Sequence, residues 1–163
     1  MRAVVVGCLL IGACGSGAAP GEGNFVAATI DGVGWRAKGA AMTRALPMTS
    51  TIMFAIDGYT PLPSTDFTSN APAPGTPRLR IEFTGATPAP GSYDIASTRD
   101  LQVTYGPDEN RTFAAQTGTI VISRIDPDGV DGTFSFVGLL TPGGPETVAV
   151  TGGSFSAPIW IVP

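Results

Sequence analysis

Apolar and polar residues alternate one by one along several parts of the chain. The segment RLRIEFT, residues 78–84, places a leucine, an isoleucine and a phenylalanine at every second position, and GTFSFVGLL, residues 132–140, repeats the pattern with two phenylalanines and a leucine. A period of two puts the apolar side chains on one face of a strand, which is typical of antiparallel strands with one face in the core and one in water. We therefore expect half-buried strands in both segments.

Strand-like runs of this kind recur between clusters of turn-forming residues. Their spacing predicts a sandwich or a barrel. Helix is barely supported, because the longest helix-compatible stretch after the amino terminus, residues 37–46, is closed by Pro47. The fold prediction is therefore all-β: a single antiparallel β-sandwich over residues 24–163, with a barrel-like form as the alternative. Strands are expected at residues 25–30, 35–44, 51–57, 78–84, 92–95, 101–105, 112–115, 119–125, 132–140, 147–151 and 154–162.

Two turns are indicated by their chemistry. Asp31-Gly32 is a dipeptide that tolerates the positive φ angles of hairpin turns, and Pro127 with Gly129 suits a chain reversal. Residues 58–77 differ, because their many prolines preclude regular strand pairing. A loop of this length in a compact domain is usually functional or disordered, and the sequence leaves both interpretations open.

The amino terminus predicts an exported, lipid-anchored protein. After Arg2, an uncharged and mostly apolar run over residues 3–13 ends in small residues, which is the layout of a secretory signal peptide. The run is too short to span a membrane, which takes about 20 apolar residues. Ile11-Gly12-Ala13-Cys14 resembles the lipobox of bacterial lipoproteins, in which the cysteine thiol receives diacylglycerol before cleavage. The resemblance implies a signal peptide at residues 1–13, and a lipidated Cys14 with a flexible tether over residues 14–23.

Two other cleavage sites remain open. Cys8 fits a looser lipobox, although its apolar core would fall below the length of about 7 residues that export requires. A plain secretory peptide cut near Ala19 would discard Cys14. All of these cleavage sites predict that the domain is exported from the cytoplasm. Gly15 and Ser16 stand where an aspartate commonly retains lipoproteins at the inner membrane, so the expected location is the cell envelope, with the lipid anchor in the outer membrane.

The balance of charge argues against nucleic acid as a partner. The chain has 9 basic and 13 acidic residues, a formal net charge of −4 at pH 7, and it loses Arg2 with the signal peptide. Binding to nucleic-acid phosphates requires a cationic face. Arg78 and Arg80, the nearest approach to a basic cluster, alternate with apolar residues and fit the water-facing side of a strand.

The chain lacks the side chains of most catalytic and zinc sites. It has no histidine, and its two cysteines, Cys8 and Cys14, lie in the amino-terminal segment. A serine with a lysine base would require Ser-x-x-Lys, but Trp35 stands three residues before Lys38, the one lysine of the chain. Glycosidase-type carboxylate pairs depend on a distance in space that the sequence does not give. We expect no enzymatic activity and no cofactor.

Asp126, Asp128 and Asp131 crowd the segment DPDGVD. An oxygen-rich loop of this kind is what Ca²⁺ prefers, but an EF-hand loop would place its third ligand at Val130 and a glutamate at Val137. A plain hairpin turn is therefore the preferred interpretation, and a weak Ca²⁺ site is the alternative.

Large aromatic residues are the remaining candidates for contacts. Trp35 and Trp160 lie beside a hairpin turn or in an apolar strand, where such residues more often belong to the core. Tyr59, at the start of the proline-rich segment, is the best candidate for a surface contact with a ligand. A concave face with an exposed Tyr59 or Trp160 would favour a binding or accessory module with a protein or glycan partner. A smooth Thr/Ser surface would favour a structural or adhesive surface protein.

The order of these motifs resembles a group of uncharacterised bacterial lipoproteins, best represented among Bacteroidetes. The resemblance rests on an early IDG-x-x-W hairpin (residues 30–35), a central G-x-Y-D (91–94), the pair GTIVISRID and GTFSF (118–126 and 132–136), and a final VTGGSF (150–155). It covers most of the domain after the signal peptide. It implies a shared fold, but no activity, because the group has no assigned catalytic residues to carry over.

Overall fold

The strands of the domain form one sheet that curls around a hydrophobic core. The computed structural model describes residues 24–37, 42–48, 51–59, 74–85 and 87–161. The strand order is β11-β3-β4-β5-β7-β8-β9-β10-β1-β2 in an 11-stranded sheet, with β6 paired to β8 outside this order. The strands are β1 (Phe25–Ile30), β2 (Val33–Arg36), β3 (Met42–Met48), β4 (Thr51–Gly58), β5 (Arg78–Gly85), β6 (Gly91–Asp94), β7 (Leu101–Gly106), β8 (Thr112–Asp126), β9 (Gly129–Thr141), β10 (Thr147–Ala157) and β11 (Ile159–Ile161).

The all-β, antiparallel prediction is confirmed. The strand pairs are antiparallel, except that β11 pairs with β3 in parallel. The described ranges contain no helix, and hence none long and apolar enough to cross a membrane.

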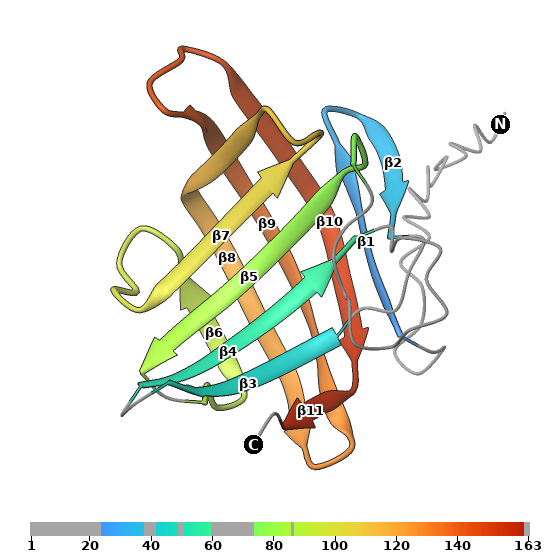
Figure 1. Cartoon of the computed structure of the whole chain (residues 1–163), viewed down its shortest axis with the longest axis vertical. Coiled ribbons are helices and arrows are strands. Elements are labelled where there is room, and N and C mark those ends of the chain that lie inside the picture. Colours follow the sequence, from blue (N-terminus) through green and yellow to red (C-terminus); the bar gives the residue numbers. More distant parts are fainter. Residues whose placement is uncertain (1–23, 38–41, 49–50, 60–73, 86, 162–163) are drawn as a thin grey trace, which may run out of the picture.

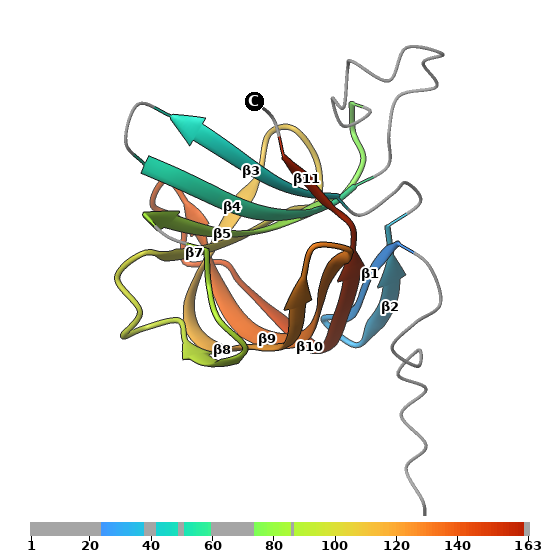
Figure 2. The same cartoon turned by 90° about the horizontal axis from the view of Figure 1, so that it is seen from below.

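The sheet curls so that its two halves face each other. Strands β3, β4, β5 and β7 cross over β8, β9 and β10, as Figure 1 shows, and the view along the curl in Figure 2 places the two groups on opposite sides of the interior. After Ala157 the chain passes through Pro158 into β11, which pairs with β3 at the far edge of the sheet. The two faces of the expected sandwich are therefore parts of one sheet, in the barrel-like form that we considered as the alternative.

Several strand boundaries differ from the expected ones because the ladders continue across β-bulges. The segments expected at 112–115 and 119–125 form the single strand β8, with a register shift between Ala115 and Thr117. Residues 147–157 likewise form β10, with a shift between Val150 and Gly153. A bulge adds an unpaired residue and bends the strand without ending it. The strand expected at 35–44 is divided between β2 and β3, and residues 38–41 lie outside the described part of the chain.

The inward-facing side chains of both halves form the core. In β5, Leu79, Ile81 and Phe83 are buried, while the residues between them are half-buried. In β9, Phe134 and Phe136 are buried, and the residues that flank each of them on the strand are exposed or small. Both alternating segments therefore bury the face that their sequence predicts. Each buried side chain of this size stabilises the fold by about 1.5–3 kcal/mol.

Trp35 packs against this core from its edge. Its side chain is partly buried, and its ring meets the ring of Tyr105 edge-on, with 6.5 Å between the ring centroids. The position agrees with the expectation that Trp35 is a packing residue. Trp160 lies in β11, and its side chain is outside the described residues.

Two phenylalanine rings of the core lie over glycines of the neighbouring strand. Gly153 pairs with Phe134 and Gly132 pairs with Phe155 across the β9/β10 ladder. A Cβ atom on Gly153 would come within 2.4 Å of the ring of Phe134, and one on Gly132 would come within 2.4 Å of the ring of Phe155. The rings thus occupy the space in which side chains of these two positions would stand.

Candidate functional site

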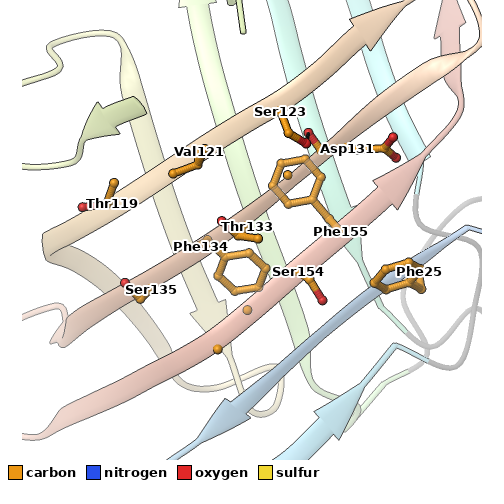
Figure 3. A pocket seen from close by; sticks show the side chains of 13 residues that line it. Phe25, Thr119, Val121, Ser123, Asp131, Thr133, Phe134, Ser135, Ser154 and Phe155 are labelled. Atoms are coloured by element: carbon orange, nitrogen blue, oxygen red, sulfur yellow. Dashed lines mark hydrogen bonds between the residues drawn. The ribbon is translucent and has the colours of Figure 1, made fainter. Parts of the chain in front are cut away.

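The outer face of β8, β9 and β10 carries a hollow of about 440 Å³. Its lining comes from these strands and from β1, as Figure 3 shows. The outward-facing residues between the buried ones are mostly small and hydroxyl-bearing, among them Thr133 and Ser135 of β9, both exposed. The lining residues are Phe25, Thr119, Val121, Ser123, Asp131, Gly132, Thr133, Phe134, Ser135, Gly152, Gly153, Ser154 and Phe155.

A second hollow of about 200 Å³ adjoins the first along the same strands. Ser135 lines both hollows, and Val137 lines the second. Val121 and Val137, one in each hollow, are 37% and 45% exposed, respectively. The outer face therefore offers an extended surface on which apolar side chains stand between hydroxyl groups.

β-Bulges account for the uneven outer face. The ladder shifts register between Ile122 and Arg124 in β8 and between Val150 and Gly153 in β10, and residues at both places line the larger hollow. Gly152, inside the β10 bulge, has a φ of 57°, a conformation that glycine adopts without a steric cost. Because bulges bend and twist a strand locally, the surface between two of them does not stay flat.

Phe25 forms one border of the larger hollow. It pairs with Ser156 of β10, so it faces outward, whereas its neighbour Val26 belongs to the core cluster. Phe25 is nevertheless only 2% exposed. The guanidinium carbon of Arg36 lies 4.8 Å from the centre of its ring, a cation–π arrangement that covers the ring with the side chain of the next strand.

Asp131 also lines the hollow and is 8% exposed. Its Oδ2 atom accepts a hydrogen bond of 2.5 Å from Nε of Arg124, which is paired with it across the β8/β9 ladder. Its Oδ1 atom is buried and has no hydrogen-bond partner among the described residues. The hydrogen bond from Arg124 lowers the pKa of Asp131 and outweighs the burial of the carboxylate, which acts in the opposite direction. Asp131 is therefore ionised at neutral pH.

The other two acids of the predicted cluster form the hairpin turn. Asp126 pairs with Gly129, and its Oδ1 atom accepts hydrogen bonds from the backbone N–H groups of Asp128 and Gly129. Its Oδ2 atom accepts a hydrogen bond of 2.6 Å from Nη1 of Arg124, which lowers the pKa of Asp126. The expected hairpin turn is present.

These carboxylates converge on Arg124 rather than on a site for an ion. Asp126 and Asp131 each form an ion pair with its guanidinium, and Asp128 is exposed. Across the described ranges, no group of three or more histidine, cysteine, aspartate or glutamate residues is placed to hold a metal. The Ca²⁺ alternative therefore has no support from the described geometry.

Tyr59 does not occupy the exposed position that we expected. It directly follows β4 and is 6% exposed. Burial, and to a smaller extent the charge of Asp57, raises its pKa. A ligand contact at Tyr59 stays a prediction, without the surface exposure that motivated it. Cys14 and residues 60–73 lie outside the described part of the chain.

The sequence pattern does not predict the hollow. The alternation in residues 132–140 predicts that Thr133 and Ser135 face water, and nothing in it connects Arg124 with Asp126 and Asp131. The available signal was the repeat of threonine, serine and valine at the outward positions of two neighbouring strands, in TIVIS and GTFSFV. The concavity depends on the bulges, which this pattern does not reveal.

Comparison with known proteins gives a family but no named relative. No curated protein matches the chain, and no solved structure matches it either. The model of one protein family, described as a domain of unknown function (DUF6252), matches residues 23–157, a range that contains every strand from β1 to β10. The chain therefore belongs to the DUF6252 family of domains of unknown function.

Proposed function

We propose that this protein is a lipid-anchored binding module of the bacterial cell envelope, and that it holds a ligand in the hollow on the outer face of β8, β9 and β10. The observation that carries the proposal is this hollow of about 440 Å³, together with its smaller neighbour. Ligand sites typically measure about 300–1,000 Å³ and combine apolar lining with a few polar groups.

The anchor is proposed from the sequence. Cys14 ends a lipobox-like motif, and residues 15–23 connect it to the start of β1 at Phe25, which borders the hollow. A Gly-rich segment of this length spans about 15–18 Å on average. The binding face would therefore stay close to the membrane surface in which the acyl chains are embedded.

A structural or adhesive surface protein is the second candidate. The outer face is rich in threonine and serine, and the exposed large apolar residues of the described ranges, Val33, Val121 and Val137, include no aromatic residue. Such a face also suits lateral packing against a neighbouring surface. We assign no reaction to the hollow, because Asp131, its one lining carboxylate, is engaged by Arg124.

Site-specific photocrosslinking in native membranes tests the proposal. The photoreactive residue p-benzoylphenylalanine is placed at position 133, inside the hollow, and in a separate full-length variant at position 102, where Gln102 is exposed on β7. A binding module gives an adduct from position 133 that saturates with irradiation, and none from position 102. Adducts of equal yield at both positions, or no adduct at either position, would contradict a binding function for this face. The structural or adhesive surface protein would then be the remaining candidate.

A further inference from the structure

We propose that the ligand of this hollow is a neutral, hydroxyl-rich oligosaccharide chain that lies across β8, β9 and β10. The inference rests on the proposed binding function and goes further by naming the class of ligand. Its basis is the chemistry of the lining, which combines side-chain hydroxyls from three strands with one ionised carboxylate. The hydroxyl-bearing residues are Thr119 and Ser123 of β8, Thr133 and Ser135 of β9, and Ser154 of β10.

The hydroxyl groups match a partner that both donates and accepts hydrogen bonds. Each serine or threonine hydroxyl has one donor and two acceptor positions, and a sugar hydroxyl has the same set. Ser123 differs from the others because its hydroxyl already donates to the carbonyl oxygen of Asp131. An acyl chain in this place would cover the hydroxyls of Thr133 and Ser135 without replacing their hydrogen bonds to water, which is unfavourable. The apolar surface of Val121, beside them, suits the C–H faces of a sugar ring.

Asp131 adds a carboxylate to the lining, and one of its two oxygen atoms has no hydrogen bond among the described residues. Its Oδ1 atom is buried and has no partner within the described ranges. A buried oxygen without a hydrogen bond is unfavourable, and this cost is removed if the lining side chains move so that a ligand hydroxyl reaches Oδ1. Because Asp131 carries a charge, hydrogen bonds to its carboxylate are stronger than those between neutral groups.

The place of the hollow in the sheet argues against an extended peptide. Peptides that bind β-sheets add a strand to a free edge and use its unpaired backbone groups. The hollow lies over β8, β9 and β10, which are inner strands with a hydrogen-bonded neighbour on each side. Recognition here depends on side chains, and Arg124 offsets the charge of Asp131 that would otherwise attract a cationic ligand.

The test measures binding of defined neutral oligosaccharides to the full-length chain in detergent solution. The probes are maltohexaose, cellohexaose, laminarihexaose and chitohexaose, followed by saturation-transfer NMR and calorimetry. We expect at least one of them to bind. Thr133→Val removes one hydroxyl at nearly constant volume and should weaken that binding about 2- to 10-fold. Thr147→Val, an exposed position of β10 outside the hollow, should leave it unchanged.

Two results would overturn the assignment of the ligand. One is the absence of binding for all four oligosaccharides, and the other is equal binding by wild type and Thr133→Val. Photocrosslinking at position 133 reports separately on the binding function. If the adduct formed there contains protein or lipid instead of carbohydrate, the hollow is a binding site and the oligosaccharide inference is wrong. Circular dichroism of both valine variants verifies that each retains the fold.

Discussion

Two hydrogen bonds join Asp31 and Ala149, although 118 positions separate them in the sequence. The backbone N–H of Asp31 donates to the carbonyl oxygen of Ala149 at 2.9 Å, and the backbone N–H of Ala149 donates to Oδ1 of Asp31 at 2.8 Å. Asp31 lies in the turn between β1 and β2 with a φ of 47°. One residue of the IDG-x-x-W motif thus forms the hairpin turn and also attaches it to β10.

Asp31→Ala should destabilise the protein by about 1–3 kcal/mol, because it leaves the N–H of Ala149 without its acceptor and puts alanine at a positive φ. Asp31→Asn is the matched control, since its side-chain oxygen can still accept the bond and asparagine tolerates this backbone conformation. Urea denaturation measures the free energy of unfolding of both variants. Equal losses in the two variants would contradict the assigned role of the Oδ1 atom.

Gly153→Ala should destabilise by about 1–3 kcal/mol, the usual cost of overpacking a core. The added Cβ would come within 2.4 Å of the ring of Phe134, which must then move. Gly34→Ala serves as the control, because nothing lies within 4 Å of a Cβ added there. Thermal denaturation compares the stabilities of the two variants. A Gly153→Ala variant as stable as wild type would show that the ring of Phe134 can pack in this way without a glycine at position 153.

Arg124→Gln should make stability less dependent on pH in the acid range. Arg124 lowers the pKa of Asp131 in the folded state, so the pair contributes stability above the unfolded pKa of about 3.9 and loses it as pH falls through the folded pKa. The free energy of unfolding of the wild type should therefore exceed that of the variant most near neutral pH. This difference in stability should shrink below about pH 4.

Urea denaturation at several pH values measures this difference. Arg111→Gln provides the comparison, because it breaks an ion pair with Asp108 that is more exposed than that of Asp131. Arg111→Gln should lower the stability at neutral pH by less than Arg124→Gln does. A stability difference between wild type and Arg124→Gln that grows as pH falls would contradict the assigned sign.

Cys14→Ser should abolish incorporation of labelled fatty acid in the native host and release the domain from membranes. Cys8→Ser should leave both unchanged, because the lipobox-like motif ends at Cys14. Labelling of membrane and soluble fractions after expression of each variant decides between the two cysteines. Undiminished labelling of Cys14→Ser would exclude lipidation at this position.

The sequence predicted those features that depend on neighbouring residues. Alternation in RLRIEFT and GTFSFVGLL gave the buried faces of β5 and β9, and the chemistry of Asp126, Pro127 and Gly129 gave the turn between β8 and β9. Both signals lie within a few residues of the structure that they determine.

Features that depend on strand register could not be predicted in this way. Arg124 meets Asp131 because they are partners across a ladder that shifts by one bulge just before them. Each bulge changes which residues share a face, so the outer hollow follows from several registers at once. Tyr59 was expected at the surface from its place beside a proline-rich segment, but burial depends on the packing of distant segments, which its neighbours in sequence do not reveal.

The pairing of β1 with β10 sets the order in which the domain can be completed. β1 precedes the other strands of this sheet in the chain, yet its ladders are with β2 and with β10, and β10 follows every other strand of the sheet except β11. β3 likewise receives its parallel neighbour only when β11 has been made. The sheet therefore cannot be completed before β10 and β11 are available, and contacts between such distant segments make folding slow. Until then, the edges of β1 and β3 stay open to other strands, which makes the incomplete domain prone to aggregation.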